Sequence, residues 1–439
     1  MKSQPLAAGV SALLLAVALT ACSGGSSESD STTGSGDAPV TLTYWASNQG
    51  ASLENDKEIL TPELAKFTQQ TGIKVNLEVV PWSDLTNNTL AAAVSGQGPD
   101  VLNIGNTNAT TFQSTGAFHP FDDAALQKIG GKDRFVESAF ATAGPPGAAP
   151  TSIPLYSQVY ALYYNKKTFA DAGLQPPTTW EELVSAAQKL TDPAKKKYGI
   201  VIPGGTVNVS MHFSYIFSEQ YGGSAFDQAG KPSFTSPGMI NGVKQYVDLI
   251  GKHHVVNPSA AQYTDSAQAA GDFARGDAAM YMAQTSGINV LKQNGMEPDQ
   301  YGIVPIPAPA SGTKISSFVA GTNLSVFKNT KHLDAALQFV KFMTSDEEQQ
   351  ILNKAYTTQP AVKGASAAFT DDQEKLDAFT KILAEQAKPL PLIPGIQAFQ
   401  ANVGGEVVGL IAKAATGATI GDAEIKAALE QAQQKMGAS

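Results

Sequence analysis

Few side chains in this chain of 439 residues have the types and spacing that catalysis requires. Acidic residues are adjacent at three places, and two carboxylates a few ångströms apart are the arrangement that hydrolyses glycosides. Adjacent residues on a helix point about 100° apart, however, and two of the pairs fall in first turns of predicted helices, where acidic side chains favour the helix dipole. We therefore interpret the pairs as helix starts and expect no enzyme, with a secreted glycosidase as the alternative. The pairs are Asp122–Asp123, Glu181–Glu182 and Glu347–Glu348.

The five histidines are not spaced like metal ligands. His253 and His254 are adjacent and therefore diverge, and no third histidine or carboxylate stands at ligand spacing. Tyr163 and Tyr164 stand in a predicted strand, where successive side chains alternate between the two faces, so at least one should belong to the core. We expect neither a metal nor a cofactor.

The only cysteine, Cys22, follows a segment typical of export signals. Lys2 is the one charged residue before it, and residues 6–19 are almost wholly apolar. A membrane-spanning helix needs roughly twenty such residues, so the pattern favours a signal peptide over residues 1–21. Leu-Thr-Ala-Cys resembles the bacterial lipobox, which implies a diacylglyceryl thioether on Cys22. The alternative is an ordinary signal peptide with an incidental cysteine.

Residues 22–39 are nearly free of apolar side chains, and we interpret them as a flexible tether. The sequence therefore predicts an exported body that a lipid on Cys22 anchors to the outer face of the cytoplasmic membrane. Because the chain has one cysteine, no disulfide can form within it.

The charge pattern excludes some partners. The net charge is −9, and no basic patch is present, so nucleic acid is not expected. Charged residues make up only 16% of the chain, and its amide-rich composition suits an uncharged, polyhydroxylated ligand.

Hydrophobic periodicity predicts the elements that must position a site. Residues 40–46 and 73–80 alternate like strands, and Leu60, Leu64 and Phe67 form the apolar stripe of a helix between them. Strand, helix and strand with short connections predict a parallel βαβ unit. Thr179 with Glu182, and Ser345 with Glu348, predict capping boxes at two helix starts. The α/β pattern places a ligand near strand carboxyl ends or in a cleft between lobes.

Several stretches together resemble a known family, the extracellular solute-binding proteins of ABC importers, specifically the carbohydrate-binding group that is similar to maltose-binding protein. The stretches cover most of the chain after the tether, in the family's order. They are FTQQTGIKVNLEVVP (67–81), GPDVLNIGNTNATTFQSTGAFHPF (98–121), YALYYNKKTFADAGLQPPTTWEELVSAAQKL (160–190), FARGDAAMYM (273–282) and GTNLSVFKNTKHLDAALQFVKFMTSDEEQQ (321–350).

The resemblance implies a type II periplasmic-binding-protein fold: two α/β lobes, a hinge of several crossings and a ligand cleft between the lobes. Mapped onto this chain, the first lobe is 40–160 with 283–322, and the second is 161–282 with 323–439. The crossings are expected near Tyr160, Met282 and Asn323. A membrane permease is the implied docking partner, and we expect a monomer.

Candidate ligand-binding residues follow from strand ends and from the resemblance. Trp45, Ser47, Asn48 and Gln49 follow the first strand and Trp82 the second; core packing is the alternative for both tryptophans. The resemblance adds Asn106 and Asn108, then Tyr156 and Gln158, for which solvated loop residues are the alternative. It also adds His212, for which a hydrogen-bonded, partly buried histidine is favoured. Asp100 is expected to brace its loop.

The family pattern is broken at two aromatic positions. Gln284, Thr285 and Ser286 stand where maltose binders of the family carry a tryptophan, and Gln400 and Ala401 replace a late aromatic pair, although Phe399 remains. Gln284, Ser286, Gly321 and Phe399 complete the candidate site. The missing platforms argue against maltodextrin. The expected function is capture of a mono- or oligosaccharide for an ABC importer, with a polyol or osmolyte as the alternative ligand.

Overall fold

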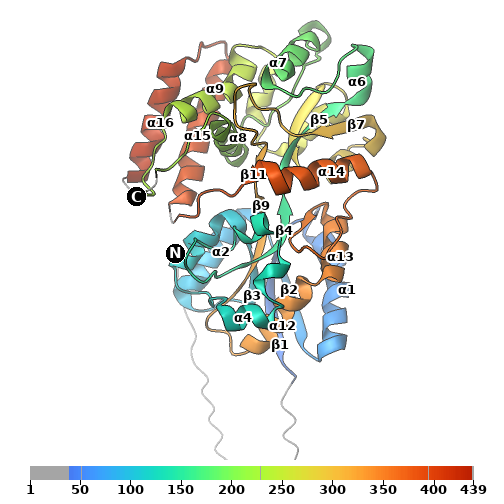
Figure 1. Cartoon of the computed structure of the whole chain (residues 1–439), viewed down its shortest axis with the longest axis vertical. Helices are drawn as coiled ribbons and strands as arrows, with labels where there is room; N and C mark the ends of the chain where they lie inside the picture. The colour runs from blue at the N-terminus through green and yellow to red at the C-terminus, as the bar shows by residue number, and fades with distance from the viewer. Residues whose placement is uncertain (1–38, 51, 228, 394, 438–439) are drawn as a thin grey trace, which may run out of the picture. The chain divides into compact units, whose positions relative to one another are not determined.

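The computed structural model describes residues 39–50, 52–227, 229–393 and 395–437. The predicted signal peptide, Cys22 and the tether up to residue 38 lie outside the described residues. The described part contains two groups of strands and helices, each with its own hydrophobic core, which we call the first and second lobes (Figure 1). Among its helices none is long and apolar enough to cross a membrane.

The first lobe is built on a six-stranded mixed sheet with the order β10-β4-β9-β3-β1-β2. The predicted βαβ unit is confirmed, since β1 pairs in parallel with β2 and also with β3. The antiparallel strand β9 pairs with both β3 and β4. The strands are β1 (Thr41–Ser47), β2 (Lys74–Val80), β3 (Val101–Gly105), β4 (Ile153–Gln158), β9 (Ala320–Val326) and β10 (Gln359–Pro360).

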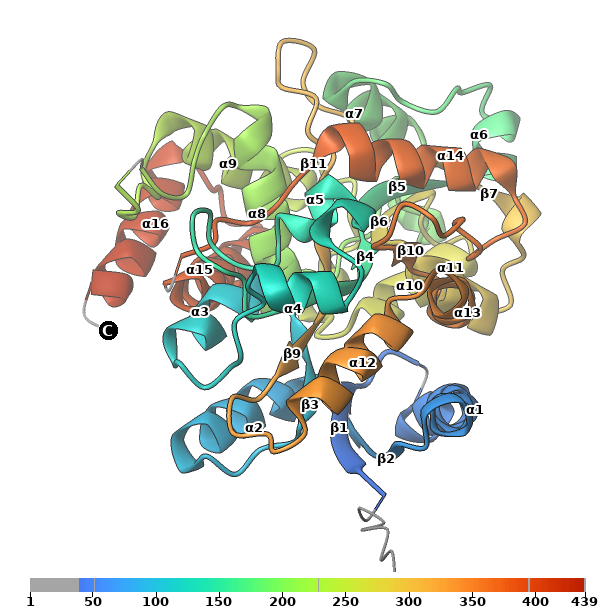
Figure 2. The same ribbon diagram turned by 60° about the horizontal axis from the view of Figure 1, so that its bottom comes forward.

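Helices cover both faces of this sheet because the side chains of β1 alternate. Leu42 and Tyr44 pack in one core with α1, while Trp45 packs in another with α2, and Figure 2 shows α1 and α2 on opposite sides of the strands. The helices are α1 (Leu53–Thr71), α2 (Trp82–Ser95), α3 (Ala109–Ser114), α4 (Asp123–Lys128), α5 (Glu137–Phe140), α12 (Leu333–Met343) and α13 (Asp346–Tyr356), with 3-10 turns η1 (Asn106–Asn108) and η2 (Lys132–Arg134).

The second lobe surrounds a three-stranded antiparallel sheet with the order β6-β5-β7. β8 and β11 form a separate, short parallel pair. Its strands are β5 (Tyr160–Asn165), β6 (Met280–Gln284), β7 (Tyr301–Val304), β8 (Ser317–Phe318) and β11 (Ala387–Lys388). Tyr163 is fully buried in β5, so the prediction that at least one tyrosine of its pair belongs to the core is confirmed.

Helices supply most of the second lobe's core. They are α6 (Lys166–Asp171), α7 (Trp180–Lys189), α8 (Val207–Gln220), α9 (Pro237–Gly251), α10 (Ser266–Ala274), α11 (Gly287–Gln293), α14 (Gln373–Lys381), α15 (Ile396–Ala415) and α16 (Asp422–Gly437). The short turns are η3 (Pro193–Lys195), η4 (Pro258–Gln262), η5 (Pro298–Gln300) and the π-turn η6 (Ile382–Gln386).

The strand pairing differs from the predicted division of the chain. Residues 283–322 were expected in the first lobe, yet β7 pairs with β5 and buries Tyr301 and Ile303 in the core of the second. Residues 323–439 were expected in the second lobe, yet β9 and α12 pack in the first, where Phe339 contacts Tyr44. The chain therefore changes lobes near Val159, near Val319, and between Val362 and Phe369.

The two predicted capping boxes have different outcomes. At α7 the box is complete, since the Thr179 hydroxyl accepts from Glu182 N and the Glu182 carboxylate accepts from Thr179 N. At α13 only half is present: Ser345 accepts from Glu348 N, while the Glu348 carboxylate accepts from Lys66 of α1 at 2.6 Å. A side chain from the other helix thus replaces the local cap.

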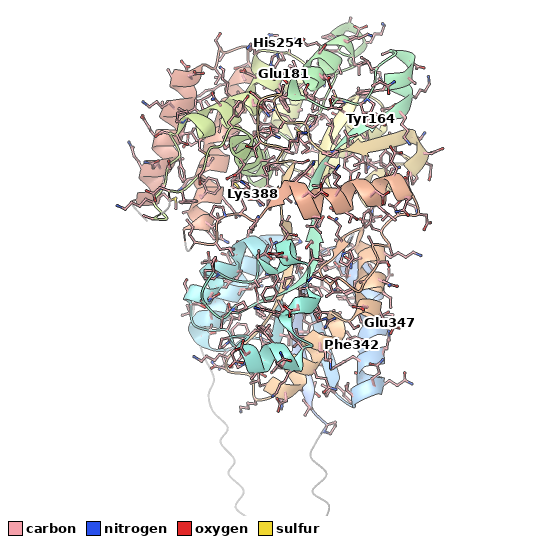
Figure 3. All side chains as sticks on the ribbon, in the orientation of Figure 1. Tyr164, Glu181, His254, Phe342, Glu347 and Lys388 are labelled. Carbon is pink, nitrogen blue, oxygen red and sulfur yellow. The ribbon has the colours of Figure 1, made fainter. Side chains whose placement is uncertain are left out.

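Lys66 gathers acidic side chains between α1 and α13. Its Nζ lies 2.7 Å from Glu347 and 3.8 Å from Glu63, in addition to Glu348. Figure 3 shows Phe342 and Glu347 on the side of the first lobe that carries α1. The Glu348 side chain is only 1% exposed. Its burial raises the pKa of Glu348 from 4.5 to about 7, although the hydrogen bond from Lys66 opposes the change.

This pKa predicts a loss of stability as the pH rises from about 4.5 to about 7, because the unfolded chain then releases a proton that folded Glu348 retains. Glu348→Gln should remove that contribution. We expect its free energy of unfolding to fall less between pH 5 and pH 8 than that of the wild type, by on the order of 1–3 kcal/mol. Denaturant unfolding at both pH values measures this, with Glu347→Gln, 71% exposed, as the control. Equal pH slopes in wild type and Glu348→Gln would contradict the assignment.

Candidate functional site

One cavity of about 350 Å³ is lined by residues of both lobes. Three of its lining residues come directly after the carboxyl ends of the parallel strands: Gln49 after β1, Trp82 after β2, and Asn106 after β3. This is the edge of an open α/β sheet at which ligands bind. The lining residues are Gln49, Trp82, Thr86, Gly105, Asn106, Thr107, Asn108, Gln158, Asn208, His212, Gln284, Phe318, Ala320, Gly321, Thr322, Gln397 and Gln400.

Three larger cavities are each confined to a single lobe. One of about 480 Å³ is walled by prolines 305, 307 and 309 with residues 176–179 in the second lobe. Another of about 480 Å³ lies beside residues 96–100 and 327–332 in the first lobe, and one of about 380 Å³ lies between α1, α12 and α13. None of the three is lined by residues of both lobes. The interlobe cavity is therefore the candidate site despite its smaller volume.

Carboxamides dominate the lining of the interlobe cavity, which contains no aspartate, glutamate, lysine or arginine. A carboxamide can donate through its NH₂ group and accept through its oxygen, as a hydroxyl of a polyol requires. The Oε1 of Gln158 is buried and accepts no hydrogen bond within the described structure. A buried acceptor without a partner costs free energy, so a ligand hydroxyl that donated to it would gain affinity.

Trp82 offers the one tryptophan surface in the cavity. Its side chain is 41% exposed, and its ring lies 3.5 Å from the position that a Cβ on Gly105 would occupy. The ring therefore lies beside β3 and is partly exposed. An exposed indole face binds the CH groups of a sugar ring by apolar contact.

Gly321 has to lack a side chain for the cavity to form as it does. Its φ is +151°, and a Cβ there would meet the carbonyl oxygen of Tyr156 at 2.3 Å. The strand β9 can thus lie against β4 while its first residues border the cavity.

His212 is the only ionisable side chain in the lining and is neutral. Its Nδ1 lies 2.8 Å from the hydroxyl of Tyr160, and burial lowers the pKa of His212 from 6.5 to about 3. Burial also raises the pKa of Tyr160 well above 10. Above pH 4 both groups therefore act as uncharged hydrogen-bonding groups.

Two hydrogen bonds join the lobes at the cavity. Asn106 Nδ2 donates to the carbonyl oxygen of Val319 at 2.9 Å, and Gln397 Nε2 of α15 donates to Asn108 Oδ1 of η1. The cavity is therefore bounded by contacts between the two lobes as well as by strand ends.

The loop that carries Gln49 is organised by a buried carboxylate. Asp56 is 0% exposed, and its oxygens accept from the backbone N–H of Gln49 at 3.1 Å and of Gly50 at 2.9 Å. The side chain of Asn48 donates to the same carboxylate. Asp56 stands in the first turn of α1, so its hydrogen bonds hold the loop against the start of this helix.

Comparison with known families identifies the chain. The sequence pattern of the family described as bacterial extracellular solute-binding protein matches residues 50–350. The chain belongs to this family. A diacetylchitobiose-binding protein of Streptomyces coelicolor is 25% identical over 360 residues, which are 81% of this solute-binding protein and 81% of the relative.

Solved structures of solute-binding proteins have the same fold. One of an ABC transporter from Thermotoga lettingae, bound to α-D-tagatose, is 23% identical with a TM-score of 0.75 and covers 90% of this chain and 100% of its own. Another, from Agrobacterium radiobacter in complex with ribitol, is 25% identical with a TM-score of 0.72, covering 90% and 97%. The predicted two-lobed α/β fold is confirmed.

The structure brings many of the candidate residues to the interlobe cavity of this solute-binding protein. They come from loops after β1, β2 and β3, from β4, α8, β6 and β9. They are Gln49, Trp82, Asn106, Asn108, Gln158, His212, Gln284 and Gly321. Their contact with a ligand stays a prediction.

Other candidate residues are placed away from that cavity, because their side chains serve the fold. Tyr156 is 2% exposed in the first core, and Phe399 is fully buried against Phe226 and Phe234. Ser47 is buried and accepts from Asn103.

Three more candidates also lie outside the cavity lining. Asn48 bonds to Asp56, and Trp45 packs in the core beneath α2. Ser286 lines a separate, smaller cavity. The expectation for Asp100 is confirmed, since its carboxylate accepts from Thr43 and Thr330 and braces its loop.

Sequence reasoning missed several lining residues. Thr86 stands one helical turn after Trp82, and Gln397 with Gln400 stands one turn apart on α15, so helical spacing could have found both. Asn208 and Phe318 reach the cavity only through the packing of the second lobe against the first, for which local sequence carries no signal.

Because no lining group titrates between pH 5 and pH 9, ligand affinity should be constant over that range. The dissociation constant of a bound neutral sugar, measured by calorimetry at pH 5, 7 and 9, should vary less than about twofold. The pKa of His212, lowered by burial to about 3, lies below this window. A tenfold change centred near pH 6.5 would mean that His212 is an exposed, charged ligand group.

Proposed function

We propose that this solute-binding protein is the substrate-binding component of an ABC importer. It captures a mono- or oligosaccharide in the cleft between its lobes and delivers it to a membrane permease. The observation that carries the proposal is the charge-free, carboxamide-lined cavity bordered by Trp82 at the carboxyl ends of the sheet strands. Binding there would bridge the lobes, because Gln397 and Asn108 already approach each other across it.

The ligands of related proteins support a carbohydrate. The Streptomyces coelicolor relative binds diacetylchitobiose, and the Thermotoga lettingae protein was solved with α-D-tagatose; both ligands are uncharged and rich in hydroxyls. The family consists of solute-binding proteins, which supports a receptor that binds its ligand without altering it chemically. We therefore propose a non-enzymatic, monomeric receptor. Asp122–Asp123, Glu181–Glu182 and Glu347–Glu348 stand outside the lining.

A polyol is the second candidate ligand. The Agrobacterium radiobacter structure contains ribitol, and hydrogen bonds from carboxamides do not require a ring. The aromatic surface distinguishes the two candidates, because Trp82 gains more contact from a flat sugar ring than from a flexible chain.

We also propose that the protein is anchored outside the cytoplasmic membrane by lipid on Cys22. The support is chemical and local: an apolar segment, small residues before a single thiol, and a polar tether after it. Several acyl chains on one residue hold a protein stably, whereas a single chain does so only marginally. Mass spectrometry of the exported N-terminus tests this, and Cys22→Ala should release the protein from membranes.

Thermal unfolding of residues 40–439 with a panel of neutral sugars, polyols and glycosides tests the function. A ligand at a hundred times its dissociation constant adds about 2.7 kcal/mol to the free energy of unfolding, which raises the melting temperature by a few degrees. We expect such a rise with at least one neutral sugar. A rise with polyols alone would replace the carbohydrate assignment, and cleavage of a glycoside would overturn the receptor assignment.

A further inference from the structure

A second, smaller cavity adjoins the interlobe cavity on the side of the second lobe. Its volume is about 80 Å³, and Gln284 at the end of β6 lines both cavities. A second link is the hydrogen bond between Tyr160, which lines the small cavity, and His212, which lines the large one. We call this space the side cavity. Gln284 and the Tyr160–His212 pair thus connect the linings of the two cavities.

The walls of the side cavity differ chemically from those of the main one. Four apolar side chains contribute to its lining, namely Val209 of α8, Met282 and Ala283 of β6, and Val290 of α11. Val209, Met282 and Ala283 are each less than a tenth exposed, so its floor is the core of the second lobe. Its polar side chains are those of Tyr160, Tyr281, Gln284, Ser266 and Ser286. The Tyr160 hydroxyl already bonds to His212, and the Tyr281 hydroxyl donates to the carbonyl oxygen of Ser266. Few polar partners are therefore available for a ligand hydroxyl.

We propose that the side cavity is a subsite for one small substituent of the ligand that ends in a methyl group, while the ligand's hydroxyls occupy the main cavity. This deepens the proposed function and rests on it. The ligand class it names is a neutral sugar that carries a deoxy methyl or an N-acetyl group. The volumes agree with this division of the ligand. The side cavity, at about 80 Å³, holds only a few atoms, whereas the main cavity, at about 350 Å³, holds the rest of the ligand.

Apolar walls favour such a substituent over a hydroxyl for a physical reason. A hydroxyl moved there would lose its water hydrogen bonds with few replacements, whereas a methyl gains by leaving water. One methylene-sized group in a fitting apolar pocket changes affinity by roughly 10–200-fold. Discrimination of about tenfold between sugars that differ only at this group is therefore expected.

Calorimetric titration of residues 40–439 with matched sugar pairs tests the subsite. The pairs are N-acetylglucosamine with glucose, N-acetylgalactosamine with galactose, L-rhamnose with L-mannose, and L-fucose with L-galactose. In at least one pair the substituted sugar should bind about tenfold more tightly. Val290→Phe, which fills the side cavity from α11, should reduce that affinity to the level of the unsubstituted partner and leave the partner's affinity unchanged.

Two variants control the measurement. Val94→Phe makes the same change at a side chain that is 91% exposed on α2, and it should alter neither affinity. Val209→Leu enlarges a side chain of α8 in the same lining and should reproduce Val290→Phe if that variant does not fold. If unsubstituted sugars bind equally well in every pair, or if Val290→Phe weakens both members alike, the subsite is refuted and the proposed function stands. If no neutral sugar binds, both fail together.

Discussion

Asp56→Ala should destabilise the protein by about 3 kcal/mol and weaken ligand binding. The substitution leaves the backbone N–H groups of Gln49 and Gly50 and the amide of Asn48 without their acceptor. Each buried donor that loses its partner costs roughly 1–3 kcal/mol, and water can replace part of the loss. Binding should weaken because the loop that holds Gln49 at the cavity is no longer fixed.

Denaturant unfolding and sugar titration of the same samples measure both effects. Glu58→Ala is the matched control, since it removes an exposed acid from the same helix and should change stability by less than about 0.5 kcal/mol. Asp56→Asn keeps one acceptor oxygen and should fall between the wild type and Asp56→Ala in both measurements. A stable Asp56→Ala with unchanged affinity would show that α1 does not hold the loop.

The β1–α1–β2 unit could be predicted from the sequence because its signals are local. Alternation in two strands, an apolar stripe and a glycine stop are all read within 40 residues, and they suffice to bring Gln49 and Trp82 to one sheet edge. The complete cap at Thr179 is local in the same sense. At Ser345 the sequence pattern predicted a local hydrogen bond that does not form. The Glu348 carboxylate accepts from Lys66 of α1 instead of from the backbone at the start of its own helix.

The division into lobes could not be predicted because it depends on pairing between distant segments. The sequence of β7 is compatible with either sheet, and only burial of Tyr301 and Ile303 against β5 places it in the second lobe. Likewise Phe339 of α12 packs on Tyr44 almost 300 residues earlier. The sequence pattern of one segment therefore does not indicate which distant segment it contacts.

Prediction of the individual site residues was also limited by contacts between distant segments. Asn48 and Asn106 have equal chemistry, and both follow strands of the first sheet. Asn48 is held by Asp56, which is eight residues away along the chain, whereas Asn106 lines the cavity and bonds to Val319 of a distant segment. Phe399 was selected as an aromatic platform, yet its face of α15 packs on Phe226 and Phe234, while Gln397 and Gln400 border the cavity. The residue type indicated the chemistry, and tertiary packing decided where it is used.

Trp82→Ala should weaken the binding of a neutral sugar about 30-fold while leaving the unliganded protein nearly as stable as the wild type. Truncating a tryptophan at the centre of a binding surface costs 2 kcal/mol or more, which corresponds to about this factor. The effect on folding should be small because the side chain is 41% exposed and stands in the first turn of α2, outside both main cores.

Tyr221→Ala is the control that distinguishes loss of ligand contact from the general effect of removing an exposed aromatic side chain. Tyr221 is also 41% exposed but does not line the interlobe cavity, so its removal should leave sugar affinity unchanged. Trp82→Phe keeps an aromatic face of smaller area and should recover part of the affinity. If Trp82→Ala binds sugars as tightly as the wild type, the ligand does not stack on this ring. Hydrogen bonds from the carboxamides alone would then have to hold it, which favours an open-chain polyol over a sugar ring.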